Sequence, residues 1–221
     1  MNAPPKVIIH NSISLDGSLT GFEPNMDLHY QIAGKYKPEA HLIGANTVKV
    51  GVELFGEGVP TEERKDFKKP TRANSLPLWV IPDTTGALKG LLHTCRRFEY
   101  CRDVVVLLSE GTPEDYFVHL RERNYDYHIV GKRHVDLKRS LELLSVKYRV
   151  RTVLADTGRI LSNLLLEQRL ASEISLLIHP VIVGKKAYTI FDNISKGVIL
   201  KLQKQEIMGK GFVWLVYKVT S

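Results

Sequence analysis

Cysteine is scarce in this chain of 221 residues, which holds only Cys95 and Cys101. Two cysteines cannot build a disulfide framework, so the sequence excludes the small secreted proteins that depend on one. Together with His93 they could in principle donate to zinc, but the spacing matches none of the usual paired-ligand patterns. We therefore expect two reduced thiols near a surface loop and no metal site.

Long apolar runs are also absent. No stretch approaches the roughly 20 residues that a membrane-spanning helix needs, and the first residues lack the layout of a signal peptide. We therefore expect no membrane partner and a cytoplasmic location. The composition, with 43% hydrophobic and 25% charged residues, is that of an ordinary globular protein. A single domain over residues 1–221 is the expected organisation.

No strongly one-signed charge run is present, although the formal net charge is +7. A positive balance suits anionic partners, either nucleic acid or phosphorylated small molecules. The positive charges are dispersed, and their densest groups, residues 64–69 and 132–134, are typical of solvated loops. Because no nucleic-acid motif accompanies them, a phosphorylated small molecule is the expected partner.

Several signatures of catalysis and nucleotide binding are missing as well. The sequence has no G-x-G-x-x-G after a strand and no Walker A sequence. It also lacks H-E-x-x-H, G-x-S-x-G and the zinc deaminase pair of H-x-E with P-C-x-x-C. The sequence therefore excludes a protein that carries the standard dinucleotide-binding fingerprint or one of these catalytic motifs.

Short runs rich in Val, Ile and Leu alternate with helical stretches through most of the chain. The predicted strands are Lys6–His10, His41–Ile43, Leu78–Ile81, Val104–Leu108, Tyr127–Val130, Thr152–Ala155 and Glu173–Ile178. The predicted helices include Pro113–Asn124, with Thr112 as cap and Pro113 at its first position, and Asp136–Tyr148. This alternation predicts an α/β fold with a mostly parallel central sheet covered by helices on both sides.

The last quarter of the chain changes character. Val198–Glu206 and Phe212–Val219 flank a glycine-containing turn and predict an antiparallel hairpin that closes one edge of the sheet. The longest loop is predicted at about Gly56–Leu76, which is charged and contains two prolines. Such a loop either borders a site or is a mobile excursion.

The segment Ala155-Asp156-Thr157-Gly158-Arg159 is the most informative part of the sequence. It follows an apolar strand and leads into the leucine-rich segment from Leu161 to Leu166. A glycine lets backbone approach a ligand closely, and the first N–H groups of a helix have no partner within it. With the positive charge of Arg159, this turn predicts a site for a phosphate-bearing ligand.

Three further strand-end turns could contribute to a site. Ser14-Leu15-Asp16-Gly17 could orient a ligand hydroxyl or amine, although a plain Asp-Gly turn explains it equally simply. In Gly44-Ala45-Asn46-Thr47, Asn46 or Thr47 could cap a helix, or the free N–H groups could hold phosphate. Asp83-Thr84-Thr85-Gly86 is the third. Ligands of open α/β sheets bind at the carboxyl ends of the strands, so these turns carry more weight together than singly.

Taken in order, these segments resemble the reductase of riboflavin biosynthesis, which has the dihydrofolate reductase-like fold. The resemblance rests on S-L-D-G at 14–17, G-x-x-T-V at 44–48, the strand and turn at 153–158, Glu173-Ile174 and P-x-x-x-G at 180–184. It spans nearly the whole chain. It implies a three-layer α/β/α arrangement with a C-terminal antiparallel hairpin, and a homodimer whose interface the hairpin or an exposed strand edge could supply.

The resemblance also implies an activity and a set of site residues. The activity is NADPH-dependent reduction of a ribosylamino-pyrimidine 5'-phosphate to the ribitylamino compound, with NADH as the less favoured cofactor. Asp16 would be the catalytic carboxylate, with Asn11 and Ser14 beside it at the substrate. The residues expected to contact the cofactor are Gly44, Thr47, Asp83, Thr84, Asp156, Thr157, Gly158, Arg159, Ile160 and Leu161.

The chain departs from the family pattern at informative positions. The family usually has E-G-G-G where Asp156-Thr157-Gly158-Arg159 stands, and a lysine where Ser18 stands. These differences keep two alternatives open. One is an oxidoreductase of the same fold that uses NADPH to reduce another heterocycle. The other is a non-enzymatic nucleotide-binding protein.

Overall fold

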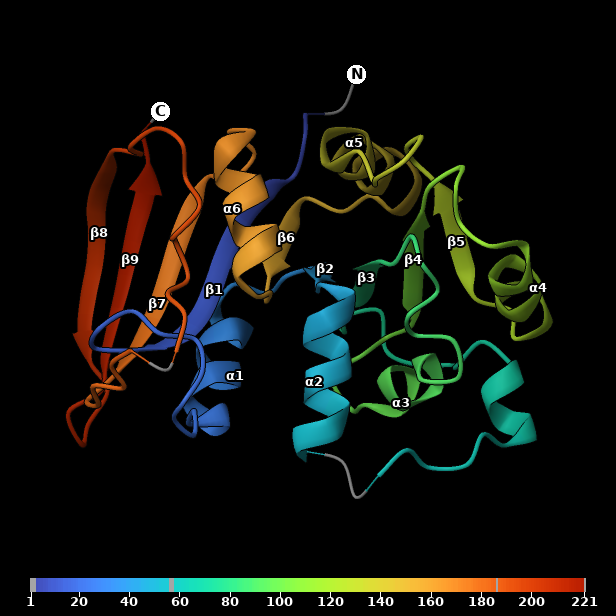
Figure 1. The fold of residues 1–221 in the computed structure, drawn as a ribbon, viewed down its shortest axis with the longest axis horizontal. Helices are drawn as coiled ribbons and strands as arrows, with labels where there is room; N and C mark the ends of the chain where they lie inside the picture. The colour runs from blue at the N-terminus through green and yellow to red at the C-terminus, as the bar shows by residue number, and fades with distance from the viewer. Residues whose placement is uncertain (1–2, 56–57, 186, 221) are drawn as a thin grey trace. The chain divides into compact units, whose positions relative to one another are not determined.

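The computed structural model describes residues 3–55, 58–185 and 187–220, and the side chains of residues 53–55 are not described. The chain divides into two compact units (Figure 1). The first contains Glu39–Arg151 with the first residues of the chain, and the second contains Lys6–Pro38 and Thr152–Ser221. Within the described residues, no helix is long and apolar enough to cross a membrane.

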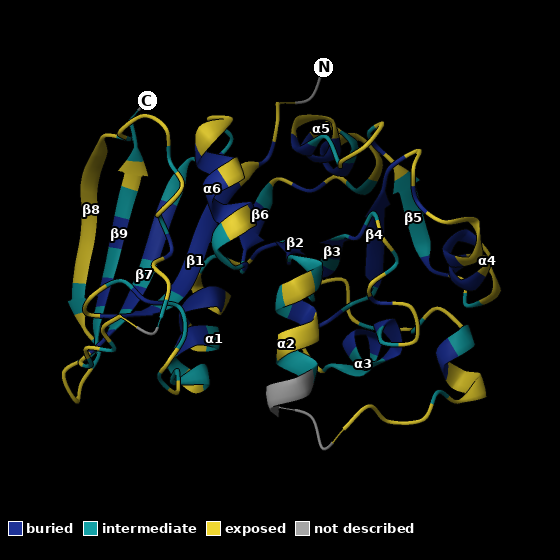
Figure 2. Cartoon of the chain, in the orientation of Figure 1, coloured by how far each residue is buried: buried dark blue, intermediate teal, exposed yellow. Residues whose placement is uncertain are grey.

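The first unit is a parallel sheet with helices packed around it. Its strands are β2 (Ala40–Leu42), β3 (Leu78–Pro82), β4 (Val104–Leu108) and β5 (Asp126–Ile129), in the order β5-β4-β3-β2. Its helices are α2 (Ala45–Phe55), the 3₁₀ helix η1 (Arg64–Phe67), α3 (Leu92–Arg97), α4 (Glu114–Glu122) and α5 (Leu137–Tyr148). All five residues of β4 are buried, as expected of a strand covered on both faces (Figure 2).

The second unit combines parallel and antiparallel strands. Its strands are β1 (Lys6–Ser14), β6 (Thr152–Ala155), β7 (Glu173–His179), β8 (Leu200–Ile207) and β9 (Val213–Val219), in the order β6-β1-β7-β9-β8. β1 is parallel to β6 and β7, whereas β9 is antiparallel to both β7 and β8. Its helices are α1 (Met26–Lys35) and α6 (Arg159–Glu167).

The predicted fold class is confirmed, with a mostly parallel sheet, surrounding helices and antiparallel C-terminal strands. Strands β4 and β6 have the predicted bounds, because β4 is an uninterrupted buried apolar run and β6 continues as one after the partly buried Thr152. The predicted hairpin is the pair β8 and β9, which begin at Leu200 and Val213 rather than at Val198 and Phe212. The strand β8 is exposed along nearly its whole length (Figure 2).

The prediction for the first strand was too short. It placed the strand end at His10, because Asn11 and Ser12 are poor strand formers, but β1 continues to Ser14. Pairing decides the outcome, since β1 bonds to β7 through the register Asn11↔Leu176 to Ser14↔His179. Strand propensity depends on such context more than helix propensity does. The extension places Asn11 and Ser12 on fixed strand faces.

The predicted caps of two helices were also wrong. Helix α2 begins at Ala45, so Asn46 and Thr47 lie inside its first turn instead of capping it. Helix α4 begins at Glu114 with Pro113 as its N-cap, and Thr112 instead accepts a hydrogen bond from the Ser109 amide over 3.1 Å. The predicted and observed helix starts thus differ by one or two residues, which is the usual uncertainty in placing helix ends.

The segment predicted as the longest loop is held by hydrogen bonds in the part that the structure describes. Gly56 and Glu57, where it begins, lie outside the described residues. Further along, the backbone carbonyl of Asp66 accepts from the buried Arg96 guanidinium at 2.7 Å. The Asp66 carboxylate accepts from Arg97, which holds the pKa of that carboxyl below its ordinary value. The 3₁₀ helix η1 is therefore anchored by two arginines of α3.

Candidate functional site

A histidine and a carboxylate meet at the carboxyl ends of β1 and β6. Nε2 of His29, on α1, lies 3.2 Å from Oδ2 of Asp156, the first residue after β6. Nδ1 of the same ring lies 3.1 Å from the Ser12 hydroxyl on β1. With Nε2–H donating to the carboxylate, Nδ1 accepts from the hydroxyl, and both ring nitrogens are satisfied. The His29 side chain is only 5% exposed, so its orientation is set by these contacts.

Behind His29 lies a second buried imidazole. The His10 and His29 rings have centroids 4.4 Å apart, and His10 Nε2 lies 3.1 Å from the His29 carbonyl oxygen. His10 Nδ1 lies 3.0 Å from the Ser175 hydroxyl, which also accepts from the Trp214 indole N–H at 2.9 Å. Burial lowers the pKa of His10 from 6.5 to about 3, helped by the neighbouring His29. His10 is therefore a neutral structural support.

Asn11 faces the opposite side of β1 from His10 and Ser12, because side chains alternate along a strand. Its amide nitrogen donates to the Thr157 carbonyl oxygen over 2.8 Å, which ties β1 to the turn before α6. Its amide oxygen is buried and has no hydrogen-bond partner among the described residues. An unpaired buried acceptor costs free energy, so this oxygen is a position where a ligand N–H or O–H group would be stabilised.

The turn from Asp156 to Arg159 begins α6 as predicted. Gly158 is the N-cap residue, and no side chain among the described residues caps this helix. Arg159 does not point into open solvent: it donates to the Asp192 carboxylate at 2.5 Å and lies over the Tyr188 ring at 4.8 Å. Of the last two residues of the predicted set, Ile160 is exposed and Leu161 is buried.

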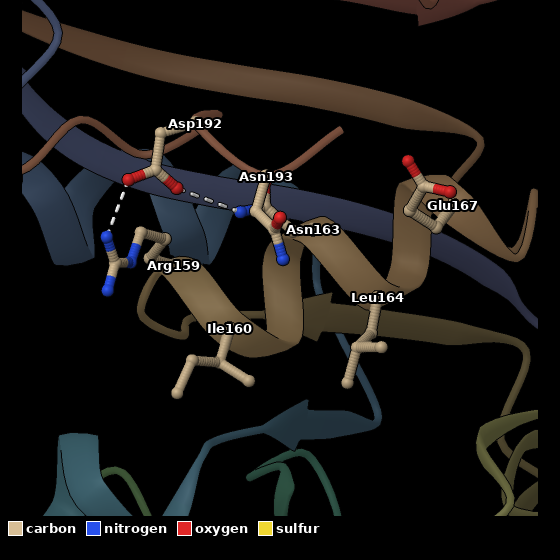
Figure 3. A pocket seen from close by; sticks show the side chains of 7 residues that line it. All are labelled: Arg159, Ile160, Asn163, Leu164, Glu167, Asp192 and Asn193. Carbon is tan, nitrogen blue, oxygen red and sulfur yellow. Dashed lines mark hydrogen bonds and ion pairs between the residues drawn. The ribbon is translucent and has the colours of Figure 1, made fainter. Parts of the chain in front are cut away.

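A pocket of about 360 Å³ lies along the same helix. Its lining residues are Arg159, Ile160, Asn163, Leu164, Glu167, Asp192 and Asn193. Figure 3 shows Arg159 and Asn163 directed toward Asp192, while Ile160 and Leu164 point away from it. The Asp192 carboxylate thus holds Arg159 and Asn163 of α6, and the cationic charge that the sequence suggested for a phosphate is already paired.

The first turn after β1 is well ordered by its own contacts. The Asp16 carboxylate accepts from the Ser14 hydroxyl at 2.5 Å and from the amides of Val183 and Gly184 at 3.2 and 2.8 Å. The Ser14 hydroxyl bond, followed by these amides, lowers the pKa of Asp16 from 3.8 to about 2. Asp16 is therefore an anion at neutral pH, and it links the turn at 14–17 to the loop after β7.

In the first unit, the predicted cofactor residues lie at the ends of β2 and β3. Gly44 precedes α2, and its carbonyl oxygen accepts from the Val48 amide at 3.0 Å, while Thr47 is in the first helical turn. The Asp83 carboxylate is buried and accepts from the amides of Ala87 and Leu88 at 3.0 and 2.9 Å. Asp83 therefore closes its own turn, beside the half-buried Thr84.

His29 was not predicted as a site residue from the sequence. Helix α1 was not predicted, although Asn25 caps it by accepting from the Leu28 amide and its buried residues His29, Ile32 and Ala33 are spaced three and four apart. This spacing places the imidazole on the helix face that packs inward. Recognising the Asn25 cap and this stripe would have shown that His29 is buried. Its partner Asp156 could not be found from local sequence.

A zinc site was considered for His93, Cys95 and Cys101. Both thiols are buried, and burial raises the pKa of Cys95 from 9.0 to about 12. His93 Nε2 lies 2.7 Å from the Pro60 carbonyl oxygen. No group of three His, Cys, Asp or Glu side chains is placed to hold a metal within residues 3–55, 58–185 and 187–220.

Comparison with solved structures places this fold among known proteins. RibD of Acinetobacter baumannii has a TM-score of 0.70 at 19% identity, and the match covers 98% of this chain and 58% of that protein. A pyrimidine reductase-like protein from Corynebacterium diphtheriae has a TM-score of 0.70 at 17% identity, covering 98% of this chain and 92% of that one. The present chain thus spans little more than half of the Acinetobacter protein.

The riboflavin biosynthesis reductase Rib7 of Saccharomyces cerevisiae is a third similar structure. Its TM-score is 0.65 at 17% identity, and the match covers 100% of this chain and 92% of that one. Identities this low establish a shared fold alone. No curated protein sequence matches the chain.

A family model gives the more specific result. The model of the RibD C-terminal domain matches residues 5–214, which include most of both units, the His29–Asp156 pair and the turn at 14–17. The match agrees with the resemblance that the sequence motifs indicated and with the fold of the similar structures. The chain belongs to the RibD C-terminal domain family.

Proposed function

We propose that the chain is a reductase of the riboflavin biosynthesis type that uses NADPH in preference to NADH. Its substrate would be a ribosylamino-pyrimidine 5'-phosphate, whose ring-opened imine is reduced at C1' to the ribitylamino compound. The family match over residues 5–214 supports the reaction class. The observation that carries the site is the buried, unpartnered oxygen of Asn11 beside the turn at 156–158.

The residues at this turn suit a dinucleotide and a sugar chain. A carboxamide N–H or a sugar hydroxyl of a ligand could donate a hydrogen bond to the Asn11 side-chain oxygen, because either group is a hydrogen-bond donor. The start of α6, which has no side-chain cap among the described residues, suits a phosphate through its first amides. In the first unit, Gly44 and Thr47 at the start of α2 remain proposed cofactor contacts, as the family resemblance implies.

A bound nicotinamide would supply the hydride, and the chain would supply position and charge. Asn11 would fix one ligand donor, and Ser14 and Asp16 would border the substrate. Asp16 is anionic at neutral pH, so it would stabilise or orient a positively charged or hydroxyl-bearing part of the substrate and would not release a proton. Holding the reacting groups in one geometry is the main source of acceleration that such a site offers.

Cofactor binding is tested by titrating the protein with NADPH and with NADH while following tryptophan fluorescence. Tighter binding of NADPH supports the proposal, and the absence of binding by either nucleotide overturns it. Asn11→Leu should weaken ligand binding because the buried amide is lost, whereas Gln203→Leu removes an exposed amide on β8 and should change nothing. Equal effects of the two substitutions would contradict the role of Asn11.

Turnover separates the proposal from its alternatives. NADPH oxidation with the diamino-ribosylamino-pyrimidinone phosphate or its deaminated form supports the riboflavin reaction. Oxidation with another heterocycle only would support the second candidate, which the replacement of E-G-G-G by residues 156–159 favours. Binding of NADPH without turnover of any heterocycle would support the alternative of a non-enzymatic nucleotide-binding protein.

A homodimer is proposed as the assembly. The edge strand β8 exposes Leu200, Leu202 and Ile207, and an edge strand carries unpaired backbone groups that a second copy could meet. Sedimentation velocity at two concentrations tests this directly. A dimer that dissociates on Leu202→Lys supports the hairpin interface, and a monomer at all concentrations contradicts it.

A further inference from the structure

We propose that His29 is a positioning residue that holds the Asp156 carboxylate in its working orientation for the hydroxyl- or amine-bearing chain of the substrate. This inference rests on the proposed function, which it deepens by naming a group that selects substrate. It starts from the 3.2 Å contact between His29 Nε2 and Asp156 Oδ2. Asp156 is the first residue after β6. The side-chain amide of Asn11 donates a hydrogen bond to the carbonyl oxygen of the next residue, Thr157.

Three side chains besides Asp156 fix the imidazole. The Ser12 hydroxyl on β1 bonds Nδ1, which leaves Nε2 to carry the proton toward Asp156. The His10 ring lies against one side at 4.4 Å, and the Tyr30 ring meets the edge at 5.2 Å. An imidazole held in this way offers one N–H in one direction. The Asp156 side chain is 20% exposed, so its carboxylate can still contact a ligand.

The histidines that face the pair are held toward the neutral form. His10, on β1, is neutral because burial lowers its pKa to about 3. His179, on β7, is also held toward the neutral form, because burial lowers its pKa and its Nε2 accepts from the Asn25 amide at 2.9 Å. The His29 N–H therefore directs the Asp156 carboxylate without a second charged imidazole beside it.

The chemistry of this arrangement points to a polyhydroxylated or amine-bearing ligand. A carboxylate accepts hydrogen bonds and donates none, so it recognises O–H and N–H groups. A phosphate at the same point would be repelled. The pair therefore belongs with the sugar or amine part of a substrate, while the phosphate part would be bound elsewhere. Displacing such a group by about 1 Å can cost on the order of 100-fold in rate.

The first test compares His29→Leu with His29→Gln. The leucine variant removes the N–H, and we expect kcat/KM for the pyrimidine substrate to fall between 10- and 100-fold while the Kd for NADPH changes less than twofold. Glutamine keeps an N–H and should recover at least half of this loss on a logarithmic scale. An equal loss in both variants, or a parallel loss of NADPH affinity, would overturn the proposal.

Matched controls separate positioning from general damage. His128 is a half-buried imidazole whose Nε2 lies 2.7 Å from the Tyr148 hydroxyl, in the first unit, so His128→Leu should leave the kinetics unchanged. The Asp156→Asn variant should show a loss similar to that of His29→Leu, and the double variant should lose little more than either. Additive losses would show that the two residues act separately.

A second measurement does not need activity. Nitrogen-15 spectra of the ring in the protein without ligand report which imidazole nitrogen is protonated, even if His29→Leu fails to fold. We expect the Nε2–H tautomer in the wild type and its loss in Asp156→Ala. If the tautomer behaves so but no pyrimidine is reduced, the proposed function fails while the pair stands. If Nδ1–H predominates in the wild type, the pair itself is refuted.

Discussion

The Arg159 guanidinium donates to the Asp192 carboxylate across 2.5 Å, so the positive charge at the start of α6 is paired within the protein. Asp192 also accepts from the Asn163 amide at 3.4 Å, and the three side chains line one pocket. A phosphate at this turn would have to compete with Asp192 for the same cation. The attraction that Arg159 offers to an anion is thereby reduced.

Asp192→Asn should therefore tighten NADPH binding. The pair is more than a third exposed on the arginine side, and exposed ion pairs contribute about 0–1 kcal/mol, so the expected gain is at most about fivefold. Isothermal titration at low and high salt measures it, because the gain should shrink as salt screens the freed charge. Arg159→Gln should show no gain in NADPH affinity, either alone or combined with Asp192→Asn, because the cation that Asp192 pairs is then absent. A loss of affinity in Asp192→Asn would instead assign the carboxylate to the binding site.

Asp83→Ala should destabilise the protein. The buried carboxylate satisfies the amides of Ala87 and Leu88, and losing it leaves one buried and one part-buried donor without this acceptor. Each unsatisfied group costs about 1–3 kcal/mol, so the free energy of unfolding should fall by at least that amount. Urea denaturation gives the change. Thr84→Ala, at the adjacent half-buried position, is the control and should have an effect of less than 1 kcal/mol, roughly.

Asp16→Asn should lower turnover more than it lowers NADPH affinity. The amides of Val183 and Gly184 both donate to the carboxylate, and an amide side chain accepts with only one oxygen. We expect faster hydrogen exchange at these two amides, measured by NMR, alongside the kinetic loss. A larger effect on NADPH affinity than on turnover would move Asp16 from the substrate to the cofactor.

The titration of Asp16 has a defined sign. Its folded pKa of about 2 lies below the ordinary 3.8, so its contribution to stability is complete above about pH 4 and is lost as pH falls through about 2. A carboxyl-carbon NMR titration should place the midpoint near that value. An inflection of kcat with pH in the range of 5 to 8 therefore cannot come from Asp16. A midpoint at 3.8 or above would contradict the lowered pKa of Asp16.

The sequence predicted the sheet well because local signals sufficed there. The buried runs Val104–Leu108 and Thr152–Ala155 are bounded by polar residues, and both strands have these bounds in the structure. Asn11 and Ser12 were placed outside the strand, since only the neighbouring β7 keeps them in it. Local pattern describes a segment by itself, whereas pairing between β1 and β7 joins residues more than 160 positions apart.

The candidate site was predicted less completely for the same reason. The turn at 156–159 was recognisable from its glycine and the strand before it. The partners that define its chemistry come from elsewhere: His29 is 127 positions from Asp156, and Asp192 is 33 positions from Arg159. A cation seen in sequence therefore looked available for phosphate, although a distant carboxylate pairs it. Which polar groups are satisfied follows only from the tertiary structure.

His10 should make the stability of the protein pH-dependent between about pH 4.5 and 6.5. Burial lowers its pKa from 6.5 to about 3, so in this window the unfolded chain binds more protons than the folded one. The free energy of unfolding should therefore fall as pH decreases through the window, by up to about 1.4 kcal/mol per pH unit from this residue. His119, His128 and His179, whose pKa values are also lowered, add to the slope with the same sign.

Replacing His10 isolates its share of that slope. His10→Asn should be less stable than the wild type at pH 7, because the bonds to Ser175 and His29 are altered, but its stability should depend less on pH. Urea denaturation at several values between pH 4.5 and 7.5 measures both effects. His134→Asn, at an exposed position, should keep the wild-type slope. If His10→Asn and the wild type have equal slopes, His10 is charged in the folded protein and cannot serve as the neutral support of His29.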